Sequence, residues 1–174
     1  MNFQGMMKEF NARKERLKTV SVGSCDQDRQ PNCAPKMLVD VVLPNQVFIL
    51  DYRFTRTYAN ITQNPQLSMS FMDDGAFTGY RFNGTCRLIE SGDEYERVKE
   101  MWRKRLTSYQ ATRIVERIKG YYSARDAENI LPDDFVIIKF EAVQGSVVKP
   151  DRILRACRED EHAPVRKKKT NEGR

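Results

Sequence analysis

The densest group of polar side chains that could bind a charged ligand lies between Asp51 and Asn60, in the run Asp-Tyr-Arg-Phe-Thr-Arg-Thr-Tyr-Ala-Asn. Two arginines and two threonines stand where a strand is expected to end and a helix to begin. Backbone N–H groups, hydroxyl donors and a planar guanidinium can converge there on one anion, and a phosphate fits that geometry best. A capping threonine beside ordinary surface arginines would give the same pattern, so both interpretations stay open.

A second feature is the run Pro-Asn-Cys-Ala-Pro-Lys-Met at Pro31–Met37. Pro35 lies inside an expected strand, where it removes a ladder donor and therefore limits this part to an edge or an irregular position. Lys36 could add positive charge to a bound ligand. Alone, this feature indicates little.

The cysteines and the histidine exclude several other kinds of chemistry. The four cysteines contain no C-x-x-C pair, and the only histidine, His162, lies in the polar C-terminal region. This argues against a structural zinc site, a multi-histidine metal centre and a Ser-His or Cys-His hydrolase. We expect reduced thiols in a cytoplasmic protein, no metal, and no identifiable catalytic acid or base.

Length and charge indicate one globular domain with a basic end. The chain has 174 residues, 40% of them apolar, and a formal net charge of +6. Arg155–Arg174 holds seven basic and four acidic residues. The difference, +3, is half of the net charge of the whole chain. A nucleic-acid or anionic-surface binding module using Arg166–Lys169 is a rival hypothesis. Four basic residues neutralise only a few phosphates, so a solubilising tail is favoured and nucleic acid is not the expected partner. No apolar run is long enough for a membrane span, and none suits a signal peptide.

Hydrophobic periodicity predicts which elements position these residues. Thr55 is expected to cap a short helix that Asn64-Pro65 ends. Met1–Gly5 is set aside as a start-site remnant. Strands are expected over 17–22, 34–43, 47–50, 67–71, 79–90 and 134–148. Helices are expected over 8–16 and 56–63. Two further amphipathic helices, separated by a break near 106–108, are expected between 91 and 125.

The dipeptide Asn83-Gly84 interrupts one of the expected strands. It is a strong signal for a two-residue hairpin, although a glycine inside a strand can also mark close backbone approach. The order of elements favours a small antiparallel barrel with helices outside over a doubly wound fold. The barrel domain is expected over 1–150, with a basic, mobile extension over 151–174 that is partly ordered to Cys157 and disordered after Pro164.

The order of these motifs resembles a known family. P-N-x-A-P-K, V-F-I-L-D, T-R-T-x-x-N-I-x-x-N-P, L-S-M-S-F and G-x-x-x-x-G-x-x-x-L-I follow one another as in the pyridoxamine 5′-phosphate oxidase-like, FMN-binding split β-barrels. The resemblance covers Leu17–Glu90 well, and Phe135–Val148 fits the closing strand. It implies a mainly β (α+β) split barrel, an FMN cofactor, and a homodimer with the flavin at its interface.

The resemblance also implies the residues that bind the cofactor. Thr55, Arg56 and Thr57 fall where the family holds the FMN phosphate, with Asn60 one turn further along the helix. Lys36 and Asp51 fall on strands that line the flavin, and Arg53 is added from charge and spacing. The expected cofactor-binding residues are Lys36, Asp51, Arg53, Thr55, Arg56, Thr57 and Asn60.

Three departures bear on the activity. The pyridoxamine phosphate oxidases proper have Ser-Arg-Lys where this chain has Thr55-Arg56-Thr57. They also have an arginine at the position near Ala34 and a lysine at the position near Val39, and this chain lacks both. They also end in a strand with Trp and Arg substrate contacts, which Arg152–Arg174 does not resemble. Vitamin B6 oxidation is therefore not indicated, and the leading hypothesis is an FMN-dependent oxidoreductase of unknown substrate. A deazaflavin or heme in the same barrel is the alternative, and the absence of a histidine before His162 weakens the heme case.

Overall fold

The computed structural model describes residues 1–118 and 135–158, with side chains described as far as Tyr109 in the long helix that ends at Ile118. Its strands are β1 (Thr19–Cys25), β2 (Pro31–Val42), β3 (Gln46–Asp51), β4 (Gln66–Asp73), β5 (Thr78–Ile89), β6 (Val136–Lys149) and β7 (Arg152–Cys157). Its helices are α1 (Phe3–Arg13), α2 (Arg56–Gln63), α3 (Asp93–Ile118) and the short 3-10 helix η1 (Asp74–Ala76).

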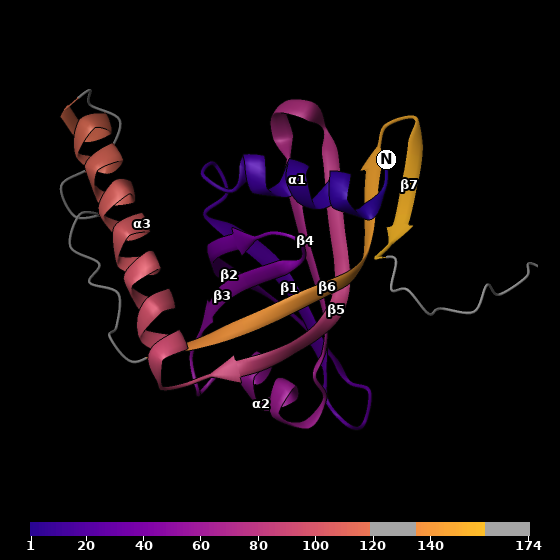
Figure 1. The fold of residues 1–174 in the computed structure, drawn as a ribbon, viewed down its shortest axis with the longest axis horizontal. Helices are drawn as coiled ribbons and strands as arrows, with labels where there is room; N and C mark the ends of the chain where they lie inside the picture. Colours follow the sequence, from indigo (N-terminus) through magenta and orange to yellow (C-terminus); the bar gives the residue numbers. More distant parts are fainter. Residues whose placement is uncertain (119–134, 159–174) are drawn as a thin grey trace, which may run out of the picture.

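The strands form one antiparallel sheet in the order β3-β2-β1-β4-β5-β6-β7, and β3 also pairs with β6. That second pairing closes six strands into a barrel, while β7 pairs with the later half of β6. In Figure 1 the long strands β5 and β6 run side by side, α2 lies toward one end of the barrel and α3 stands along one side. The predicted fold class, a small antiparallel split barrel with helices packed around it, is confirmed.

Alternating side chains fill the barrel. Along β4, Leu67, Met69 and Phe71 are buried while the residues between them face outward, as the sequence pattern predicted. A second, smaller core lies between α3 and the outer side of the barrel, where Val98 and Trp102 pack with Phe48 and neighbouring apolar residues. Among the described helices, none is long and apolar enough to cross a membrane.

The first residues of the chain belong to the fold, and setting Met1–Gly5 aside was wrong. Helix α1 begins at Phe3 rather than near residue 8, and its Phe3, Met6, Met7 and Phe10 are at most 2% exposed. Their spacing of three, four and seven residues places them on one helical face. They join the main core, where Phe10 stacks on Phe71 at 4.5 Å between ring centroids.

Asn83-Gly84 forms no hairpin, because β5 runs through it without a break and only the register shifts there. A Cβ on Gly84 would lie 2.0 Å from the carbonyl oxygen of Glu141 on the neighbouring strand β6. The second interpretation, close backbone approach, is therefore the correct one. No other residue leaves room for that oxygen.

The expected break near residues 106–108 is also wrong, since α3 is one continuous helix to Ile118. The Thr107 hydroxyl donates to the carbonyl of Arg103 at 3.0 Å, so it bonds inside the helix instead of ending it. One turn of this region is also held from outside, because the buried Arg105 guanidinium donates to the carbonyls of Lys14 and Leu17. The part of the expected second helix beyond Ile118 lies outside the described residues.

Strand boundaries differ from the predictions mainly at the β1–β2 hairpin. The expected loop over Gly23–Asn32 shrinks to a turn in which the Asp26 carboxylate accepts from the backbone N–H of Gln30 at 2.8 Å. Pro35 lies in the half of β2 that pairs with β1, outside the stretch that pairs with β3, which fits an edge position. Strand β7 pairs along its whole length with β6, inside the segment expected as a basic extension. Residues 159–174 lie outside the described part.

Candidate functional site

The start of α2 is built as the sequence predicted. Thr55 caps the helix, its hydroxyl oxygen accepting from the backbone N–H of Tyr58 at 3.1 Å, and Asn64 ends it. Directly before the cap, the N–H of Thr55 donates to the carbonyl of Tyr52 at 3.1 Å and closes a tight turn. Arg53 and Phe54 occupy the two central positions of that turn, and Phe54 is 87% exposed.

A buried ion pair fixes this turn from below. The Lys36 ammonium on β2 pairs with the Asp51 carboxylate at the end of β3, and Asp51 is fully buried. The Thr55 hydroxyl donates to the same carboxylate, with its oxygen 3.0 and 2.9 Å from the two carboxylate oxygens. Lys36, Asp51 and Thr55 therefore form one cluster, in which the lysine charge is directed to Asp51.

A second cluster ties α2 to the β1–β2 hairpin. The Asn32 amide donates to the Thr57 hydroxyl at 3.1 Å, and the Asn60 amide donates to the Ser24 hydroxyl at 3.1 Å. Thr57 and Asn60 are 1% and 2% exposed, so both side chains face the hairpin. Sequence reasoning did not select Ser24 or Asn32 as functional residues. Asn32 stands in the P-N-x-A-P-K run, but nothing in the sequence indicates which helix it faces.

The two arginines of the segment are the accessible cations. The Arg56 side chain is 57% exposed in the first turn of α2, with its guanidinium 3.5 Å from Asp26. The Arg53 side chain is 43% exposed and pairs with Glu90 at 3.2 Å, and the Tyr58 hydroxyl donates to the same carboxylate at 3.0 Å. An exposed pair of this kind contributes about 0–1 kcal/mol, so Arg56 can turn to another anion at little cost.

Both tyrosines near this turn stay protonated at neutral pH. Burial, with a smaller effect of the Asp51 charge, raises the pKa of Tyr52 above its usual value. The hydrogen bond to Glu90 raises the pKa of Tyr58. Neither phenol is therefore poised to act as a base. Among the described residues, no group of three or more His, Cys, Asp or Glu side chains could hold a metal ion.

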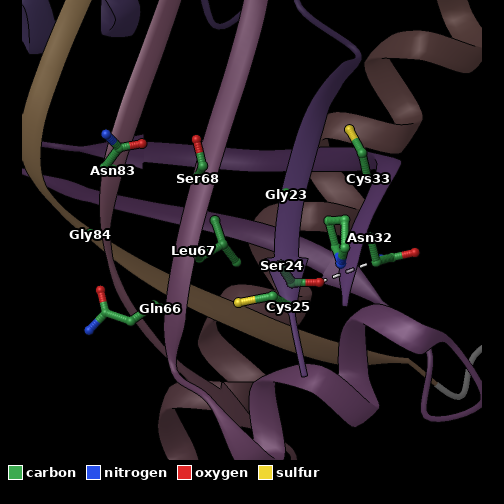
Figure 2. Close-up of a pocket in the computed structure, with 11 residues that line it drawn as sticks. Gly23, Ser24, Cys25, Asn32, Cys33, Gln66, Leu67, Ser68, Asn83 and Gly84 are labelled. Atoms are coloured by element: carbon green, nitrogen blue, oxygen red, sulfur yellow. Dashed lines mark hydrogen bonds between the residues drawn. The ribbon is translucent and has the colours of Figure 1, made fainter. Parts of the chain in front are cut away.

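A groove of about 640 Å³ lies beside the second cluster. It runs over the β1–β2 hairpin and onto β4 and β5, and Figure 2 shows Ser24, Asn32 and Cys33 on its hairpin side with Ser68 and Asn83 opposite. None of the seven residues predicted to bind a cofactor lines it. Ser24 and Asn32 connect the two regions, because they line the groove and also contact Asn60 and Thr57.

The accessible donors fit a phosphate monoester. Two exposed guanidinium groups and the backbone N–H groups at the start of α2 lie within one short segment, and helix starts attract anions. Of the other five predicted residues, Thr55 is half-buried at the helix cap, and four are buried: Lys36, Asp51, Thr57 and Asn60. Whether any of the seven touches a cofactor stays a prediction.

Comparison with known proteins identifies relatives of this fold. The sequence profile of the family described as pyridoxamine 5′-phosphate oxidase matches residues 6–149. No curated protein matches the sequence. An FMN-binding, pyridoxamine 5′-phosphate oxidase-related protein from Nostoc punctiforme has a TM-score of 0.60 and 14% identity, covering 92% of this chain and 93% of that one.

Two further solved structures are similar. A Clostridium acetobutylicum protein related to general stress protein 26 of B. subtilis, of the pyridoxinephosphate oxidase family, has a TM-score of 0.57 and 17% identity over 87% of this chain and 94% of its own. HupZ of Group A Streptococcus has a TM-score of 0.54 and 16% identity over 85% and 92%. At these identities the solved structures show a shared fold. Since the profile spans all six strands of the closed barrel, the chain belongs to the pyridoxamine 5′-phosphate oxidase family.

Proposed function

We propose that this protein is a cytoplasmic, homodimeric flavoprotein that binds FMN and acts as an oxidoreductase. The observation that carries the proposal is the pair of exposed arginines, Arg53 and Arg56, on the turn and first helical residue that open α2. Family membership supports it, as does the similarity to a solved protein described as FMN-binding.

Each predicted residue has a distinct part in this proposal. Arg56 and Arg53 bind the phosphate together with N–H groups of the α2 start, whose partial positive charge favours an anion. Lys36 and Asp51 hold the turn that carries Arg53, while Thr55 caps the helix. Thr57 and Asn60 hold α2 against the hairpin, so the phosphate site is fixed before the ligand arrives.

The bound flavin would carry the electron or hydride chemistry, and the protein would supply binding and orientation. This chain has no residue that must serve as acid or base in the proposal. The departures from Ser-Arg-Lys and from the usual closing strand argue against vitamin B6 as the substrate.

The first experiment is the absorption spectrum of freshly purified protein, followed by release and identification of the chromophore. Flavin bands and released FMN are expected. A deazaflavin or heme spectrum would show that the barrel binds that cofactor instead of FMN. A colourless protein whose thermal midpoint does not change with added FMN would contradict the proposal and favour a binding module.

Titration with FMN and with riboflavin tests the phosphate site directly. Charge-assisted hydrogen bonds contribute about 1.5–3 kcal/mol each, so FMN should bind at least tenfold more tightly. Equal affinities would place the phosphate away from the α2 start while leaving flavin binding itself intact.

A further inference from the structure

Ser146 on β6 is a buried serine that points away from the barrel core. A Cβ placed on the preceding Gly145 would meet core side chains, and the following Val147 belongs to the main core. Because side chains alternate along a strand, Ser146 lies on the outer face of the sheet. It is nevertheless only 6% exposed, and its hydroxyl has no hydrogen bond among the described residues. A buried polar group without a partner calls for an explanation.

Two arginines flank this serine on the outer face. The register pairs Ser146 with Arg81 on β5 and with Arg155 on β7. Directly paired residues share a face of the sheet, with Cβ atoms about 4.5–5.5 Å apart. Both arginines are exposed, so an ion in solution can reach them on either side of the serine. We call Arg81, Ser146 and Arg155 the arginine row.

Neither arginine of the row has a counter-charge. No hydrogen bond or ion pair holds Arg81 or Arg155 in the described part of the chain. By contrast, the exposed Arg87 and Arg97 both pair with Glu94. The adjacent outward positions carry no acidic side chain: they are Gly79 and Asn83 on β5, Gln144 and Val148 on β6, and Ile153 and Cys157 on β7. Two like charges two strand spacings apart, about 10 Å, repel each other, so the row favours an anion from outside.

We infer that the arginine row binds a phosphoryl group, either inorganic phosphate or the phosphate end of a small monoester. Two planar guanidinium groups and one hydroxyl can all donate to a tetrahedral dianion, because it offers several acceptor oxygens. A carboxylate is already satisfied by the fork of one arginine. The bound phosphoryl group neutralises both cations and gives the Ser146 hydroxyl the acceptor that it lacks.

This site is separate from the α2 start, where the proposed function places the FMN phosphate. In Figure 1 α2 lies toward one end of the barrel, and the β6–β7 hairpin lies toward the other. Among the described strands, β7 pairs only with β6. An anion that contacts Arg155 on β7 and Arg81 on β5 therefore also links the last strand to the closed barrel. Binding there does not require a flavin.

A phosphate titration of the isotope-labelled protein, followed by NMR at fixed ionic strength, tests this site. In wild type, the backbone amide signals of Ser146 and its two paired arginines should shift and reach saturation. The double variant Arg81→Gln with Arg155→Gln should bind phosphate there at least tenfold more weakly, because it loses two charge-assisted contacts. Arg87→Gln with Arg97→Gln is the matched control, since it removes two exposed arginines and the same charge elsewhere. This control should keep the wild-type affinity.

Ser146→Ala and a change of probe test the chemistry of the site. Loss of the hydroxyl should weaken phosphate binding by about two- to tenfold, because one neutral hydrogen bond is lost. Acetate at the same ionic strength should bind at least tenfold more weakly than phosphate, and equal binding would contradict a phosphoryl site. Glycerol 3-phosphate separates the two sources of the ligand. Binding as tight as that of phosphate assigns the site to a monoester, and tenfold weaker binding assigns it to inorganic phosphate.

Equal phosphate affinities of wild type and the Arg81→Gln, Arg155→Gln variant would overturn the inference, as would shifts that grow with any added salt. Native amide signals elsewhere in the spectrum would show that the variant is folded. Arg56→Ala separates this site from the proposed function, because phosphate should still shift the Ser146 signal of that variant. Saturable shifts confined to the α2 start in wild type would overturn the arginine row and leave the FMN phosphate site standing. Saturable shifts at Ser146 in a protein that binds no flavin would do the reverse.

Discussion

The Thr55 hydroxyl joins the start of α2 to the buried carboxylate of Asp51, with its oxygen 3.0 and 2.9 Å from the two carboxylate oxygens. The same hydroxyl oxygen accepts from the N–H of Tyr58. One threonine thus connects the first turn of the helix to the Lys36–Asp51 ion pair inside the barrel. The position of the exposed Arg56 follows from that buried pair.

Asp51→Asn should destabilise the fold strongly. It leaves the Lys36 ammonium, in a side chain 8% exposed, without its counter-charge, and removing one partner of a buried pair costs about 3–5 kcal/mol. Urea denaturation measures the loss. The double change Lys36→Met with Asp51→Asn should recover most of it, because no unpaired charge remains. A single variant no less stable than Glu90→Gln, which breaks an exposed pair, would contradict this account.

Gly84→Ala should cost roughly 3 kcal/mol or more, because the new Cβ would lie 2.0 Å from a backbone oxygen of β6 and cannot be accommodated without moving a strand. Gly23→Ala is the matched control on β1, where the nearest atom would be 3.6 Å away in ordinary contact. Thermal or urea denaturation of both variants checks the difference. Equal stabilities would show that β5 and β6 separate easily at this point.

Local sequence patterns were sufficient to predict most of the barrel. Alternation located β4, Thr55 predicted the helix cap, and Pro35 predicted an edge position, because each depends on residues near in sequence. The apolar spacing that buries Phe3 to Phe10 was also visible in the sequence, and it was missed because the first residues were excluded.

Contacts between distant segments could not be predicted in the same way. Gly84 is required by Glu141, and this depends on the register of β5 and β6. The segment Asp51–Asn60 was predicted as one polar site, yet Lys36 neutralises one end of it and Asn32 engages the other. The Lys36 contact is fixed when β2 pairs with β3, and the Asn32 contact is fixed when β2 pairs with β1 and α2 packs against that hairpin.

Thiol reactivity should follow burial. Cys33 and Cys157 are exposed, whereas burial raises the pKa of Cys86 to about 12, and its thiol donates to the Pro65 carbonyl at 3.2 Å. Since the thiolate is the reactive form, Cys86 should react with a disulfide reagent at pH 8 only after unfolding. Two fast thiols are expected in the native protein, with Cys25 slower. Rapid reaction of Cys86 in a Cys86-only variant with native circular dichroism would contradict this burial.

Acid should weaken the contact between α3 and the barrel through Glu94. The hydrogen bond from Lys139 at 2.8 Å, aided by Arg87, holds the pKa of Glu94 below its usual value. A carboxylate with a lowered folded pKa stabilises the protein above its unfolded pKa, and this stabilisation is lost as pH falls through the folded value. Glu94→Gln should therefore reduce stability at pH 7 and flatten its decline below about pH 4.5. If the stability of wild type and of Glu94→Gln fell in parallel as the pH is lowered, Glu94 would not contribute to the loss of stability in acid.

Arg56→Ala should weaken FMN binding at least tenfold, which corresponds to about 1.4 kcal/mol. Arg56 is the exposed guanidinium in the first turn of α2, where it can bind a phosphate that the helix start also attracts. Arg103→Ala is the matched control and should leave FMN affinity unchanged, because Arg103 is 59% exposed on α3 and also pairs weakly with a nearby carboxylate.

Deletion of Arg166–Arg174, which is distant in sequence from every barrel strand, should likewise leave FMN affinity unchanged. All dissociation constants must be measured at one ionic strength, since salt screens every phosphate contact. If the tail deletion weakens FMN as much as Arg56→Ala does, the basic C-terminus belongs to the cofactor site; if Arg103→Ala does so, the effect of Arg56 is only that of net charge.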